Sequence, residues 1–125
     1  MSAGLIATMA LAGCEAPGPA PLGVPDYLGS ETRLLDGELV NVEVRVGNTD
    51  DREVVRAYAD CVAAQYALIR GYGFARHVRT QMDAKGGVWT GDAVYTISPG
   101  LPAGVRTIDA EVVVSNCALS GIPTV

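Results

Sequence analysis

The chain has 125 residues, a formal net charge of −5 and 49% apolar residues. This length suits one domain with its own hydrophobic core. The acidic balance repels phosphate backbones and anionic lipid surfaces, which argues against nucleic acid as a partner and against membrane binding through a basic patch.

The amino-terminal segment has the features of an export signal. Residues 5–12 carry no charge, and their number is typical of a signal peptide and too small for a transmembrane helix, which needs about 20 apolar residues. The segment ends in the lipobox motif of bacterial lipoproteins, Leu11, Ala12, Gly13 and Cys14. This match implies that a diacylglyceryl group is attached to the Cys14 sulfur and that the chain is cleaved before Cys14. We therefore expect a lipoprotein signal peptide at residues 1–13 and anchoring by two or more acyl chains.

The positively charged start of most export signals is absent here, which leaves open a true start codon upstream of Met1. The alternative interpretation is an alanine-rich buried helix of a cytosolic protein over residues 3–14. Gly4, Gly13 and the prolines that follow disfavour such a helix.

A proline-rich stretch follows the motif. Its four prolines remove hydrogen-bond donors and favour extended backbone: Pro17, Pro19, Pro21 and Pro25. We expect residues 14–29 to be the lipidated N-terminus and a tether, and residues 30–125 to form a single domain. A polyproline ligand for another domain is the alternative, and nothing in the neighbouring sequence supports it.

The chain contains three cysteines. If lipid occupies Cys14, then Cys61 and Cys117 remain as one pair in an oxidising compartment, which predicts a disulfide between them. Two separate buried thiols are the alternative.

The hydrophobic pattern predicts five strands and one helix. Residues 38–46 alternate cleanly between valine and polar side chains, as a half-buried strand does, and residues 51–70 show apolar side chains at helical spacing. Further strands are expected at 31–35, 74–82, 88–98 with an interruption near Gly91, and 105–116. In the last strand, strict alternation places Cys117 on the face opposite Val112 and Val114, which weakens the disulfide prediction. The expected fold is α+β, an antiparallel sheet of about four to five strands with one long helix packed on one face.

Several short motifs within residues 38–82 resemble a family of small alphaproteobacterial lipoproteins that has no assigned activity. The strand Val44-Arg45-Val46 ends in Gly47-Asn48, and the helix carries Tyr58, Ala63-Ala64 and then Gly71-Tyr72 before a strand with Phe74. Together with the lipobox, this resemblance implies an envelope protein without a known reaction.

Catalytic and metal-binding patterns are absent from the sequence. The single histidine, His77, lies between Arg76 and Arg79 without a second ligand at metal-site spacing, and we expect it on a solvated strand face with its protonated form disfavoured by these arginines. Asp50-Asp51 is interpreted as a helix start, and no serine lies in a nucleophile-elbow motif. We expect no enzyme activity, no cofactor and no metal site.

Two functions remain. The first is a lipid-anchored periplasmic domain that binds or scaffolds an envelope protein through its open sheet face or an edge strand. The second is an accessory protein that binds a small ligand, or hydrolyses one weakly, between helix and sheet. A deep polar cavity with converging Asp, Arg and His side chains would favour it. Glu15 follows the lipidated cysteine and is not the usual inner-membrane retention residue, which favours the outer membrane.

Overall fold

The computed structural model describes residue 4 and residues 23–125 of the chain. The lipobox Leu11, Ala12, Gly13 and Cys14 therefore lies outside the described residues. Within the described part there are five strands and two helices, in the order β1 (Asp26–Asp36), β2 (Leu39–Gly47), α1 (Arg52–Ile69), β3 (Phe74–Lys85), β4 (Val88–Ser98), β5 (Thr107–Asp109) and α2 (Ala110–Leu119). Neither of these helices is both long and apolar enough to cross a bilayer.

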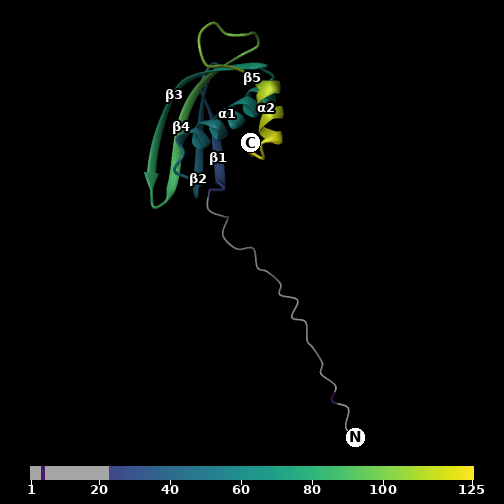
Figure 1. Cartoon of the computed structure of the whole chain (residues 1–125). Coiled ribbons are helices and arrows are strands. Elements are labelled where there is room, and N and C mark those ends of the chain that lie inside the picture. Colours follow the sequence, from purple (N-terminus) through teal and green to yellow (C-terminus); the bar gives the residue numbers. More distant parts are fainter. Residues whose placement is uncertain (1–3, 5–22) are drawn as a thin grey trace.

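The strands form one antiparallel sheet in the order β1-β2-β4-β3-β5. Helix α1 runs across one face of this curved sheet, and α2 lies beside α1 (Figure 1). The predicted α+β fold is confirmed, with a second, short helix in addition to the long one.

The core lies between α1 and the sheet. Strand β2 buries every second residue against the helix, which confirms the alternation seen in the sequence: Val40, Val42, Val44 and Val46. The facing side of α1 is rich in small side chains, and Ala59, Ala63, Ala64 and Ala67 are fully buried. Small residues bring the helix axis close to the sheet, so the valines reach the helix without leaving voids.

Strand β4 is continuous, whereas the sequence predicted an interruption near Gly91. Gly91 pairs with Val44 on one side and Met82 on the other, in the middle of the ladder. A Cβ atom at residue 91 would lie 2.7 Å from Val55 Cγ1 of α1. The glycine therefore marks a place where the helix packs tightly on the sheet, and it does not mark a break.

The ends of α1 follow from local chemistry. The Asp51 carboxylate accepts a hydrogen bond from the Glu53 amide at 2.9 Å and so caps the helix, which agrees with the interpretation of Asp50-Asp51 as a helix start. After the helix, Gly71 adopts a φ of 84°, a conformation that favours glycine and stops the helix.

The prediction of a strand over residues 105–116 is wrong. Only Thr107–Asp109 pair with β3, and α2 begins at Ala110. Asp109 caps the helix by accepting a hydrogen bond from the Val112 amide at 3.4 Å. The face that packs toward α1 has helical spacing: Ala110, Val113, Val114 and Cys117.

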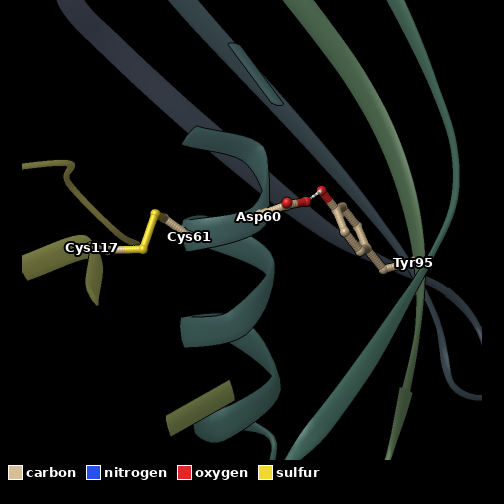
Figure 2. Close-up of a disulfide and its surroundings, with 4 residues drawn as sticks. All are labelled: Asp60, Cys61, Tyr95 and Cys117. Carbon is tan, nitrogen blue, oxygen red and sulfur yellow. Dashed lines mark hydrogen bonds between the residues drawn. A yellow bond between two sulfur atoms is a disulfide. The ribbon is translucent and has the colours of Figure 1, made fainter. Parts of the chain in front are cut away.

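The structure contains the predicted disulfide between Cys61 and Cys117, with a Cα–Cα distance of 6.0 Å. The objection that Cys117 points away from the core holds only for a strand. In α2, Cys117 follows Ala110 by seven residues and so returns to the same face. The bond links α2 to the side of α1 (Figure 2).

Removal of the disulfide by Cys61→Ser together with Cys117→Ser should lower the free energy of unfolding by about 4 kcal/mol in the chain-entropy model. The physical reason is that the bond, which joins cysteines 56 positions apart, restricts the unfolded chain. Urea unfolding of the double variant and of the oxidised parent measures the difference. Equal unfolding curves, or two free thiols in the parent under oxidising conditions, would contradict the prediction.

Candidate functional site

A polar pocket of about 260 Å³ lies between the first half of α1, strand β3 and the segment that leads into β5. Its charged and polar walls come from these three elements: Glu53, Arg56, Asp60, His77, Thr80 and Arg106. This volume is below the range of drug-sized sites, about 300–1,000 Å³, so the pocket suits a small molecule.

Helix α1 supplies three of these side chains from one face. Glu53, Arg56 and Asp60 are separated by three and four positions, and this spacing places them in a row along a helix. The row lies beside the buried face of α1, so its members border the core and still reach solvent. Asp60 is the innermost charged member, and it lies between the buried residues Ala59 and Cys61.

Strand β3 supplies His77 and Thr80 through a bulge. His77 pairs with Tyr95 and Thr80 pairs with Ala93, and the register shifts between His77 and Arg79. Without the extra residue, side chains three positions apart would point to opposite faces of the sheet. The bulge therefore turns both toward α1, where His77 Nε2 lies 2.5 Å from the Thr80 hydroxyl.

Asp60 connects the pocket to the core. The Tyr95 hydroxyl, on a side chain that is only 1% exposed, donates a hydrogen bond to Asp60 Oδ1 at 2.5 Å (Figure 2). Burial is the main cause that raises the pKa of Asp60, and the hydrogen bond from Tyr95 and the charges of His77 and Arg106 partly oppose it. Burial and the adjacent Asp60 carboxylate raise the pKa of Tyr95, which keeps its hydroxyl a donor.

His77 does not lie on a solvated strand face as the sequence predicted. It is half-buried on the helix side of the sheet, where its ring packs edge-on against Tyr95 with centroids 5.4 Å apart. Burial is the main cause that lowers the pKa of His77, followed by the charge of Arg106. The expected direction is therefore correct, but its cause is not the neighbouring residues Arg76 and Arg79.

Two arginines face the pocket with unused hydrogen-bonding capacity. Arg56 forms an ion pair with Glu53 at 3.3 Å through Nη1, whereas its Nε is buried and has no hydrogen-bond partner among the described residues. Arg106 is exposed at the mouth of the pocket and forms no ion pair with any described carboxylate, although its charge acts on Asp60 and His77.

The backbone holds Arg106 in an unusual conformation. Its φ is 58°, in the left-handed region that non-glycine residues rarely adopt and that costs on the order of 1–3 kcal/mol. Its carbonyl oxygen accepts a hydrogen bond from the His77 amide at 3.2 Å. This bond ties the segment to β3 at the bulge and fixes the position from which the guanidinium enters the pocket.

The side chains of the pocket are not arranged as a catalytic triad. Thr80, His77 and Asp60 contain the side-chain types of a nucleophile, base and carboxylate, but the Asp60 oxygen bonds to Tyr95 and no hydrogen bond joins Asp60 to the His77 ring. The carboxylate therefore does not orient the imidazole as the triad logic requires. In the described part of the chain, no group of three or more His, Cys, Asp or Glu side chains could hold a metal ion.

The comparisons with known proteins identify a family. Residues 27–121 match the model of the YNQ4 C-terminal domain, so the chain belongs to the YNQ4 C-terminal domain family. The chain is 32% identical over 104 residues to an uncharacterised 26.9 kDa protein in the nqo8 5′ region of Paracoccus denitrificans. The alignment covers 78% of this chain and 41% of that relative, so the chain spans about two-fifths of the relative's length. No solved structure matches the chain.

These findings agree with the expected alphaproteobacterial family of unknown function. Lipid attachment at Cys14 stays a prediction. Sequence reasoning identified Cys61 and Cys117 and noted His77, but it did not identify Asp60, Arg56, Thr80 or Arg106. One signal was present, because Asp60 is a poor helix former placed between two residues that fit the buried pattern of the helix.

Substitution of Asp60 should have opposite effects depending on the replacement. Asp60→Asn keeps an acceptor for the Tyr95 hydroxyl and removes a carboxylate whose ionised form is disfavoured by burial. Because the pKa of Asp60 is raised above 3.8 in the folded state, the wild type loses stability as the pH rises from 3.8 through that raised pKa. Asp60→Asn should therefore gain stability relative to the wild type across this window and retain the gain at higher pH.

Asp60→Ala leaves the buried Tyr95 hydroxyl without its acceptor and should lose about 1–3 kcal/mol. Urea unfolding of all three proteins at a series of pH values measures both effects. An Asp60→Asn variant that is less stable than the wild type at neutral pH would show that the carboxylate stabilises the fold.

Proposed function

We propose that this protein is a lipid-anchored bacterial envelope protein whose single domain faces the periplasm and binds a small polar ligand without catalysis. The membrane-anchored part of this proposal rests on the lipobox that ends at Cys14 and on the Cys61–Cys117 disulfide, a bond typical of exported domains. The outer membrane is the favoured location because of Glu15.

The pocket between α1, β3 and Arg106 carries the binding part of the proposal. Side chains of Asp, Arg and His converge there from three separate elements, the arrangement that distinguishes a ligand site from a scaffold surface. The Arg106 guanidinium, which forms no ion pair with a described carboxylate, provides a contact that a ligand would complete.

A second candidate function, docking of an envelope protein, is favoured by the edge of the sheet. Strand β1 is an edge strand, and three of its leucines are exposed: Leu28 at 42%, Leu34 at 41% and Leu35 at 51%. An edge strand with apolar side chains can accept a further strand from a partner. The register shifts near Gly29 and Asp36 interrupt this edge, so we place this function second.

Ligand binding is testable by thermal unfolding of the purified mature protein in the presence of single compounds from four classes: acetate, ethylamine, L-alanine and glucose. At about 100 times its dissociation constant, a ligand should stabilise the fold by about 2.7 kcal/mol. We expect at least one class to raise the unfolding temperature, and we expect Arg106→Gln to reduce the rise caused by acetate or L-alanine, because it removes a positive charge that faces their carboxylate.

Arg79→Gln is the matched control, because Arg79 is exposed and pairs with Val94 on the face of β3 that α1 does not cover. If no class stabilises the protein, while a stoichiometric protein co-purifies from gentle envelope extracts and is lost with Leu35→Asp, the domain functions in docking.

The anchor is tested by Cys14→Ala in the full chain expressed in a bacterial host. The substitution removes the thiol to which lipid is attached, so the protein should move from the membrane fraction to another fraction or remain as an unprocessed precursor. Fractionation and the mass of the native N-terminus measure both. A Cys14→Ala variant that stays in the membrane fraction at the parent's length and amount would refute lipid anchoring.

A further inference from the structure

The charges of the pocket are balanced but separated. Two arginines face two carboxylates, and the ion pair between Arg56 and Glu53 joins one of each at the outer rim, where Glu53 is exposed. Arg106 and Asp60 are then left without opposite charges in direct contact. A site of this kind attracts neither simple anions nor simple cations strongly, because either ion meets a like charge as well as an opposite one.

The positive end of the site consists of the guanidinium groups of Arg106 and Arg56, which both line the pocket. Guanidinium groups hold carboxylates by paired, charge-assisted hydrogen bonds. The hydrogen bond between the His77 amide and the Arg106 carbonyl fixes the backbone of Arg106 beside β3, so this end is preorganised.

The negative end is the Asp60 carboxylate. One of its oxygens accepts from Tyr95, and no described donor reaches the other. A ligand that offers an N–H donor with a positive charge would complete the coordination of this carboxylate and would offset the cost of burying it. Tyr95 keeps the side chain from rotating away, since loss of the hydrogen bond would leave a buried hydroxyl unsatisfied.

The geometry points to a zwitterionic amino acid as the ligand of this pocket, with its carboxylate on Arg106 and Arg56 and its ammonium group on Asp60. This inference rests on the proposed function and adds the chemical class of the ligand. The pocket volume of about 260 Å³ suits a molecule of this size.

Calorimetric titration of the mature full chain with three matched compounds tests the inference. L-alanine carries both charged groups, propionate lacks the ammonium group and ethylamine lacks the carboxylate. We expect L-alanine to bind about tenfold or more tightly than either of the others, since each lost charged hydrogen bond should cost at least that factor.

Two variants assign each charge to its residue. In Asp60→Asn, the preference for L-alanine over propionate should fall toward one, because the partner of the ammonium group is gone. In Arg106→Gln, the preference for L-alanine over ethylamine should fall in the same way. Asp83 and Arg79 are exposed residues of β3, and the control substitutions Asp83→Asn and Arg79→Gln should leave both affinity ratios unchanged. If Asp60→Asn fails to fold, the Arg106→Gln cycle still tests the arrangement.

The outcomes separate the inference from the proposed function. Propionate or ethylamine binding as tightly as L-alanine would overturn the zwitterion inference and leave a small-ligand site of another class. Equal losses for all three compounds in a variant would indicate a merely structural role for that residue and would also overturn it. Absence of binding by every compound, glucose and acetate included, would refute the small-ligand function itself.

Discussion

The packing of α1 across one face of the sheet is the constraint on which the rest of the structure depends. The valines of β2 and the alanines of α1 are almost fully buried against each other, and Gly91 leaves room for Val55 because it has no Cβ atom. Burial of apolar surface at this contact is the main favourable contribution to folding. It also fixes which residues lie on the two flanks of the helix. The disulfide and the polar pocket both involve residues on these flanks.

Two consecutive residues of α1, Asp60 and Cys61, illustrate this division. Cys61 points to one side of the helix and bonds to Cys117 of α2, and Asp60 points to the other side and accepts the hydrogen bond from Tyr95 (Figure 2). Neighbouring residues in a helix differ by about 100° in direction, so one turn can serve both contacts. The disulfide restrains the helix from one flank, and the Tyr95 hydroxyl holds the Asp60 side chain on the other.

The sequence predicts the regular elements well and the pocket poorly, for physical reasons. The valines of β2 alternate with a period of two and the apolar residues of α1 recur with the period of a helix. In each element the face that this period predicts is the face buried in the core. In the stretch from Ile108 to Cys117 the two periods coincide, because Ala110 and Val114 fit a strand face and a helix face equally, and the β-branched valines favour the strand. The structure shows that Asp109 caps a helix here. The sequence pattern alone does not show that this cap outweighs the strand preference of the three valines.

The pocket depends on events that no local pattern contains. A bulge next to Val78 brings His77 and Thr80 to one face, and the segment before β5 places Arg106 beside β3. The row of α1 side chains reaches the same pocket from elsewhere in the chain. Asp60 could have been noticed as a poor helix former in a buried stretch. Its partners could not, because the distances that join them are set by the sheet order β1-β2-β4-β3-β5.

Four departures from ordinary folding preferences lie around this pocket, and their proximity supports the proposed ligand site. A carboxylate beside the core, a non-glycine residue at positive φ, a bulged strand and a buried Nε without a partner each reduce stability or regularity. A double replacement, with an apolar residue at Asp60 and Phe at Tyr95, would fill the same space without a buried polar pair. Such replacements are often neutral or stabilising. Natural proteins retain unfavourable groups of this kind where binding needs them. The four departures come from three segments, α1, β3 and the segment before β5, and they meet around one small cavity, which is why the proposed ligand binding is assigned to this surface.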